Sequence, residues 1–138
     1  MILYFAYGAN MDRAEMAARC PASRSLGMAT LPGWQLAVMR EGWLTVTPAP
    51  GVSTRGVLWN LAAADMPALD AFEDVGAGLY SKQTLNVVAQ REVVALVYIG
   101  ANAGPGVARA DYLAAVTAAA RGWGLPEAAW AALRKSGT

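Results

Sequence analysis

The chain contains no histidine among its 138 residues. Ser-His and Cys-His nucleophile pairs are therefore excluded, and so is any histidine-ligated metal. Cys20 is the single cysteine, which excludes an internal disulfide and a cysteine-based zinc site. Proton transfer near neutral pH must then fall to a carboxylate, a tyrosine, a lysine or the thiol. A carboxyl group with a raised pKa is the simplest candidate.

Charge is also scarce, because charged residues make up 15% of the chain and the net charge is +1. No basic run is present, so the attraction that drives nucleic-acid binding is missing. Every apolar stretch is interrupted before about 18 residues, and the N-terminus lacks the basic segment of a signal peptide. We therefore expect a cytoplasmic protein with no nucleic-acid partner and no membrane partner. The composition leaves the oligomeric state open.

Hydrophobic residues make up 56% of the chain, which indicates a globular protein with a sizeable core. The length predicts a single domain over residues 1–138. No internal repeat or low-complexity linker divides it.

The first ten residues carry the most information. Ile2–Ala6 is a short apolar and aromatic run that predicts a buried strand, and the run breaks at once into Tyr7-Gly8-Ala9-Asn10. A strand that turns sharply into a helix leaves backbone N–H groups unpaired, and these can bind an anion or a developing oxyanion. Gly8 removes the side chain where a ligand would approach the backbone. An ordinary strand–turn–helix connection would show the same pattern.

The rest of the chain predicts more strands than helices. Asp12 and Glu15 have the spacing of a capping box at the start of a helix over residues 12–19. Asp65 is expected to cap a second short helix that ends near Phe72 or Glu73. We predict strands over residues 34–40, 43–47, 55–61, 80–89 and 93–99, loops over 48–53 and 101–106, and helices over 111–121 and from Pro126 onward.

Short turns between most of these strands favour an α+β fold with a mainly antiparallel sheet. We expect this sheet to be strongly curled or closed as a small barrel, with the helices packed outside. Periodicity alone does not say whether the barrel closes.

Two stretches resemble the signatures of the gamma-glutamylcyclotransferase-like family. Residues 4–11, Tyr-Phe-Ala-Tyr-Gly-Ala-Asn-Met, resemble its N-terminal signature, which is normally written Tyr-Gly-Ser-Asn. Residues 69–80 are similar to its second signature, a Leu-Asp pair followed by a Glu and then by Gly and Tyr. Tyr112 with Gly-Leu-Pro at 124–126 resembles the C-terminal portion of the animal enzymes, and Arg-Cys-Pro at 19–21 resembles the end of the first helix in bacterial members.

The resemblance implies a small mixed barrel and a reaction that needs no metal and no other cofactor. The expected substrate is a small-molecule gamma-glutamyl amide, whose alpha-amine attacks its own gamma-carbonyl to give 5-oxoproline and release the free amine. Because this attack is intramolecular, holding the substrate folded supplies much of the acceleration. The leaving part can be an amino acid or an amine, and the sequence does not distinguish them.

The resemblance selects Glu73 as the catalytic general base and acid. Leu69, Phe72 and Val75 are apolar neighbours whose packing would desolvate this carboxyl group and raise its pKa. The local pattern alone would make Asp70 and Asp74 equal candidates. A solvated carboxylate at a helix end is the plain structural alternative.

The same resemblance gives the expected substrate-binding residues. The backbone of Tyr7, Gly8, Ala9 and Asn10 is the expected cradle for the alpha-carboxylate or the oxyanion. Asn10 can instead stabilise the turn or cap the following helix. The further candidates are two tyrosines of the later signatures, Tyr80 and Tyr112, of which Tyr112 also fits a core position with its hydroxyl at the surface.

Two positions depart from the family pattern. Ala9 stands where serine is usual, which costs little if the backbone amide acts and weakens activity if the hydroxyl binds substrate. We favour the backbone role. Asp74 replaces the usual Gly. These departures leave open a second function, a non-catalytic small-molecule binding module on the same fold.

Overall fold

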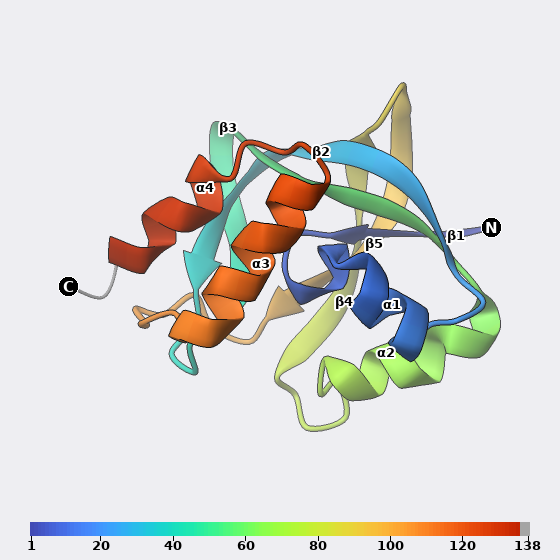
Figure 1. Cartoon of the computed structure of the whole chain (residues 1–138), viewed down its shortest axis with the longest axis horizontal. Coiled ribbons are helices and arrows are strands. Elements are labelled where there is room, and N and C mark those ends of the chain that lie inside the picture. Colours follow the sequence, from blue (N-terminus) through green and yellow to red (C-terminus); the bar gives the residue numbers. More distant parts are fainter. Residues whose placement is uncertain (136–138) are drawn as a thin grey trace.

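Five strands close into a barrel in the part of the chain that the computed structural model describes, residues 1–135 (Figure 1). The last residues of the expected single domain, 136–138, lie outside the described part. The order around the barrel is β1-β3-β2-β4-β5. The strands are β1 (Ile2–Ala6), β2 (Arg24–Val38), β3 (Leu44–Leu61), β4 (Tyr80–Val88) and β5 (Glu92–Gly100).

The helices lie outside this barrel (Figure 1). They are η1 (Ala9–Met11), α1 (Arg13–Arg19), η2 (Ala63–Asp65), α2 (Met66–Phe72), α3 (Ala110–Gly122), α4 (Ala128–Ala131) and η3 (Ala132–Lys135). The predicted α+β class, with a mainly antiparallel barrel and helices outside, is confirmed. None of the described helices is long and apolar enough to cross a lipid bilayer.

The barrel closes through one parallel contact. β1 pairs antiparallel with β3 from Ile2↔Leu61 to Ala6↔Val57, and it meets β5 in parallel at Tyr4↔Leu96. The other neighbouring strands are antiparallel. The buried core is mostly aliphatic and includes residues of the strands and of the helices, and Phe5 of β1 is fully buried within it. The turn after β1 therefore emerges at one end of a packed barrel.

Two strands are much longer than predicted. β2 begins at Arg24 although the predicted strand begins at residue 34, and residues 48–53, predicted as a loop, lie within β3. The two strands pair from Arg24↔Asn60 to Val38↔Leu44, with irregularities at Ser25/Gly27 and Pro32/Trp34. Such bulges accommodate glycine and proline inside a ladder. The turn signals in the sequence therefore mark bulges in a long hairpin.

Asp12 and Asp65 behave differently from each other. The Asp12 carboxylate accepts a hydrogen bond of 2.9 Å from the Glu15 N–H and caps α1, as predicted. Asp65 does not cap α2 with its side chain, which corrects the prediction. Its carboxylate instead accepts from the Ala22 N–H at 2.9 Å and from the Ser23 hydroxyl at 2.8 Å. Asp65 thus ties the start of α2 to the segment between α1 and β2.

Two C-terminal tryptophans hold the turn that follows β1. The Trp130 indole donates to the Tyr7 carbonyl at 2.8 Å, and the Trp123 indole donates to the Met11 carbonyl at 2.6 Å. Trp130 is completely buried. α3 packs against η1 on the same side of the barrel (Figure 1). The C-terminal helices therefore fix the backbone at positions 7–11.

We predict that Trp130→Phe destabilises the protein more than Trp59→Phe does. Both indoles are buried, but among the described residues the Trp59 indole N–H has no hydrogen-bond partner, so its loss breaks no hydrogen bond. The first substitution leaves the buried Tyr7 carbonyl without its donor, which costs about 1–3 kcal/mol. Urea unfolding of both variants measures this difference. Equal losses would contradict the role given to the Trp130 indole.

Candidate active site

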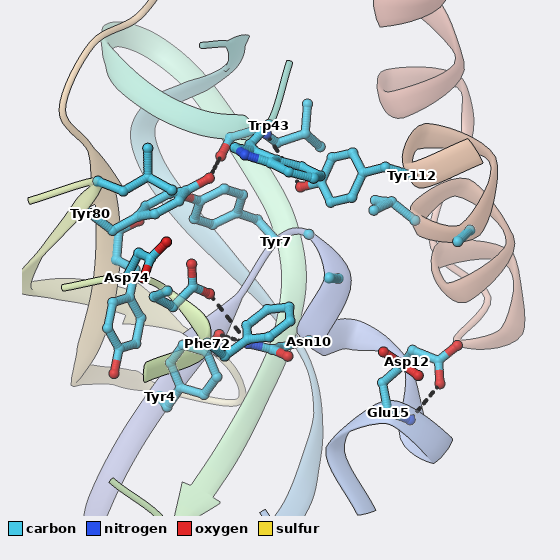
Figure 2. A pocket seen from close by; sticks show the side chains of 18 of the residues that line it. Tyr4, Tyr7, Asn10, Asp12, Glu15, Trp43, Phe72, Asp74, Tyr80 and Tyr112 are labelled. Atoms are coloured by element: carbon cyan, nitrogen blue, oxygen red, sulfur yellow. Dashed lines mark hydrogen bonds between the residues drawn. The ribbon is translucent and has the colours of Figure 1, made fainter. Parts of the chain in front are cut away.

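A cavity of about 500 Å³ opens at the end of the barrel beside the turn that follows β1. Its walls come from β1 and the turn after it, from the turn between β2 and β3, from the end of α2 and from α3 (Figure 2). Six of the seven predicted site residues belong to three of these segments, the turn after β1, the end of α2 and α3: Tyr7, Gly8, Ala9, Asn10, Glu73 and Tyr112. Tyr80, the seventh, lines the cavity from the start of β4.

Glu73 follows the last residue of α2, and its carboxyl group lies in this cavity. Burial raises the pKa of Glu73 from its ordinary value of 4.5 to about 7, although the positive charge of Arg19 acts in the opposite direction. A carboxyl group with such a pKa exchanges a proton readily near neutral pH.

Asp74 shapes the bend that carries Glu73. Its φ of 52° lies in the left-handed region, where glycine is favoured and Asp is tolerated. Its carbonyl accepts from Ala77 at 3.2 Å and from Leu79 at 3.1 Å, which closes the turn before β4. The glycine that the family resemblance places at this position would adopt this conformation without a side-chain cost.

The three candidate carboxylates of this segment are separated by the fold. Asp70 lies outside the cavity lining, where it accepts from the Tyr98 hydroxyl at 2.6 Å and pairs with Lys82 at 2.9 Å. Asp74 lines the cavity but is exposed. Of the three, only Glu73 combines burial with access to the cavity.

Asn10 connects Glu73 to the first helix. Its amide nitrogen donates to Glu73 Oε1 at 3.3 Å and to the Tyr4 hydroxyl at 3.0 Å. Its amide oxygen accepts from Arg19, which fixes the orientation of the amide. The predicted capping role of Asn10 is wrong, because Asp12 is the residue that caps α1.

Arg19 lies beside Asn10 and Glu73, although nothing in the sequence indicated a role for it beyond the resemblance at residues 19–21. It pairs with Glu15 at 3.1 Å, and its guanidinium lies 3.4 Å from the centre of the Phe72 ring. The Glu15–Arg19 spacing of four residues on a helix was visible in the sequence. What was not visible was that α1 and α2 meet at this side chain.

The backbone from Gly8 to Asn10 offers unused donors. Within residues 1–135, no hydrogen bond is donated by the N–H of Gly8, Ala9 or Asn10. The carbonyls of Gly8 and Ala9 accept from Met11 at 3.0 Å and Asp12 at 3.2 Å, so the turn is held while these N–H groups stay available. All three residues line the cavity.

Gly8 lets a tyrosine come close to this turn. A Cβ atom at position 8 would lie 3.1 Å from the Tyr112 hydroxyl oxygen. The same hydroxyl accepts from the Leu44 N–H at 3.3 Å, and the Tyr80 hydroxyl donates to the Leu44 carbonyl at 2.6 Å. Burial raises the pKa of both tyrosines, so both are neutral at physiological pH.

Tyr7 and Trp43 complete the aromatic part of the cavity (Figure 2). The buried Tyr7 hydroxyl donates to the Tyr98 carbonyl at 2.6 Å. Trp43 contacts Tyr112 edge-on, with ring centres 5.0 Å apart, and the Arg109 guanidinium lies 4.3 Å from the centre of the Trp43 ring. Nothing local in the sequence distinguishes Trp43 from the other tryptophans.

Comparison with known proteins identifies the family. The model of the family described as "Gamma-glutamyl cyclotransferase, AIG2-like" matches residues 4–118. The chain belongs to this family. Within the described residues, no group of three or more Cys, Asp and Glu side chains is placed to hold a metal ion.

Individual gamma-glutamyl cyclotransferases support this assignment. The human protein named gamma-glutamylcyclotransferase is 27% identical over 112 residues, which cover 72% of this chain and 60% of the human protein. The mouse protein of the same name is 26% identical over 137 residues, covering 91% and 73% of the two chains. This chain therefore spans about three fifths of the length of the human relative.

A solved structure titled "Gamma-glutamyl cyclotransferase" shares the fold. It superposes with a TM-score of 0.86 over 97% of this chain and 86% of the other, at 24% identity.

We predict that Glu73→Gln becomes progressively more stable than the native protein as the pH rises. The native carboxyl has a raised pKa, so its stabilising contribution is complete below pH 4.5 and is lost as the pH rises through about 7. The difference in free energy of unfolding between Glu73→Gln and the native protein should therefore grow by about 3 kcal/mol between these limits and stay constant above them. Urea unfolding across this pH range measures it.

Glu127→Gln is a control of opposite sign. A hydrogen bond from Arg121 lowers the pKa of Glu127, so this variant should lose stability relative to the native protein as the pH rises. If the difference in free energy of unfolding between Glu73→Gln and the native protein does not change with pH, the burial of the Glu73 carboxyl is contradicted.

Proposed function

We propose that this protein is a cyclotransferase that converts a gamma-glutamyl amide to 5-oxoproline and releases the free amine. The observation that carries the proposal is one shared cavity, which holds the buried Glu73 carboxyl and the unused N–H groups of Gly8, Ala9 and Asn10. Membership of the gamma-glutamyl cyclotransferase family supports the same reaction class.

Glu73 acts as the proton carrier of the reaction. The alpha-amine of the substrate attacks the gamma-carbonyl, a new C–N bond closes the five-membered ring, and the original amide C–N bond breaks. Glu73 takes one proton from the attacking nitrogen and returns it to the leaving nitrogen. A pKa of about 7 suits a group that must act first as base and then as acid.

The turn from Tyr7 to Asn10 binds the negative charge of the substrate. Its free N–H groups hold the alpha-carboxylate or the oxyanion that develops on the gamma-carbonyl. In acyl-transfer sites, each donor placed at an oxyanion lowers the activation free energy by roughly 3–4 kcal/mol. The Trp130 indole holds the Tyr7 carbonyl, so the turn is ordered before substrate binds.

Tyr112 and Tyr80 contact the gamma-glutamyl group from the aromatic part of the cavity. Their hydroxyls converge on the backbone of Leu44, which fixes both rings. Asn10 is a positioning residue in addition, because its amide aims the Glu73 carboxylate.

The test is the release of 5-oxoproline from gamma-glutamyl-amino acids and gamma-glutamyl amines. We predict that Glu73→Gln lowers kcat by about 10²–10⁴-fold, because general acid–base catalysis contributes on this scale. The native kcat/KM should rise with pH through about 7, as Glu73 loses its proton. Asp70→Asn is the matched control, and it should stay within about threefold of native, since Asp70 lies outside the cavity lining. Near-native turnover by a folded Glu73→Gln variant would end the proposal.

A non-catalytic binding module is the second candidate. Ala9 and Asp74 favour it, because both differ from the family pattern. Calorimetric binding of a gamma-glutamyl amide without any release of 5-oxoproline would establish this alternative.

We predict that Ala9→Ser changes kcat/KM by less than about threefold. The N–H of residue 9 is present in both variants, and it is the backbone donor that the proposed mechanism uses. Steady-state kinetics of the two proteins tests this. A gain of tenfold or more, about 1.4 kcal/mol, would show that a serine hydroxyl belongs in the site.

A further inference from the structure

We infer that the leaving amine of the substrate carries a second, positively charged group and no carboxylate, as in gamma-glutamyl derivatives of diamines. The inference rests on the proposed function, because it concerns the substrate of the same cavity. It makes gamma-glutamyl-amino acids poor substrates.

The acidic and basic side chains that line the cavity all have the same sign of charge. They are four carboxylates, with no lysine or arginine among the described lining residues: Asp12, Glu15, Glu73 and Asp74. A substrate that enters this cavity therefore meets negative potential, which favours a cation and disfavours an anion.

Two arginines that contact lining residues, Arg19 and Arg109, are bound by other groups. Arg19 is bound by the Asn10 amide oxygen and by Glu15, and it stacks on Phe72. Arg109 stacks on Trp43 and donates to the Glu41 carbonyl at 2.9 Å. Neither arginine is part of the cavity lining.

Only part of the negative charge is neutralised. Arg19 balances Glu15, whereas within residues 1–135 neither Asp12 nor Asp74 forms an ion pair. Asp12 accepts the capping N–H of Glu15, which leaves its charge in place. Two carboxylates in addition to Glu73 therefore act on any charged group of the substrate.

These carboxylates lie on both sides of the reacting centre. Figure 2 shows Asp74 on the side of Tyr80, and Asp12 with Glu15 on the opposite side, beyond Asn10. A leaving chain that extends from Glu73 in either direction passes a carboxylate. A terminal ammonium would be attracted along both paths, and a terminal carboxylate would be repelled along both.

The anion donors near Glu73 are already used by the reaction itself. The N–H groups of Gly8, Ala9 and Asn10 accommodate the alpha-carboxylate or the oxyanion that every gamma-glutamyl substrate carries. A second carboxylate would lack a cationic partner in the cavity, and burying such a group unpaired is costly.

The aromatic walls fit a cation as well. Tyr7, Trp43, Tyr80 and Tyr112 line the cavity, and the faces of such rings attract cations. Phe72 and Trp43 each already hold an arginine at the margin of this cavity, at 3.4 Å and 4.3 Å from their ring centres. The inference therefore stands on two independent features, the carboxylates and the rings.

The experiment compares three gamma-glutamyl amides that differ only at the far end of a chain of four methylene groups. The leaving amines are 1,4-diaminobutane, pentylamine and 5-aminopentanoate, whose ends are an ammonium, a methyl and a carboxylate. We expect kcat/KM to fall in that order, with a ratio of about tenfold or more between the first and the last at low ionic strength. Salt at about 0.5 M should reduce the ratio.

Variants assign the effect to the cavity. Asp74→Asn and Asp12→Asn should each lower the ratio about threefold, and Asn at position 12 keeps an oxygen that can cap α1. Glu92→Gln is the matched control at the first residue of β5, outside the cavity lining, and it should leave the ratio unchanged.

The outcomes are distinguishable. Equal rates for the three substrates, or a preference for the carboxylate, would overturn the inference and leave the proposed function intact. A ratio that Asp74→Asn and Asp12→Asn do not lower would also overturn it. Release of 5-oxoproline from gamma-glutamyl-alanine but from none of the three would overturn the inference alone. Absence of 5-oxoproline from all three and from gamma-glutamyl-alanine would reject the proposed function itself.

Discussion

The side chain of Asn10 joins three segments at the candidate site through its hydrogen bonds with Glu73 and Arg19. Asn10 belongs to the turn after β1, Glu73 ends α2, and Arg19, which fixes the Asn10 amide, ends α1. This one side chain sets the distance between the free N–H groups and the buried carboxyl. It also gives Glu73 a donor, which limits the cost of placing a carboxylate away from water.

The barrel fold tolerates the free-energy cost of burying the Glu73 carboxyl. β1 is short, but it is paired on both edges, and the turn that leaves it is held by Trp130 and Trp123. The stability lost by burying the Glu73 carboxyl is thus offset by ordinary core packing at a distance. Such a conflict between local stability and the rest of the fold is typical of functional sites. The lining of the cavity shows a similar conflict, because its described residues include four carboxylates and no lysine or arginine.

Much of this arrangement follows from the sequence. The strand over Ile2–Ala6 and the Asp12 cap could be predicted from local patterns. The short signatures also picked out Gly8 and Glu73, which the structure places in one cavity. The long hairpin of β2 and β3 could not, because its bulges carry the same glycines and prolines as loops. The contacts of Arg19 and Trp130 could not be predicted from the sequence either. They join residues from different helices and turns, and only the closed barrel brings these together.

The most direct test of this account is the pKa of Glu73 in the free protein. The chain has five glutamates, Glu15, Glu41, Glu73, Glu92 and Glu127, so carboxyl-¹³C labelling of glutamate gives few signals, and Glu73→Gln identifies the one of interest. A burial-driven titration with its midpoint at about pH 7 is the predicted result. A midpoint near the ordinary value of 4.5 would place the carboxyl group in water and contradict the account.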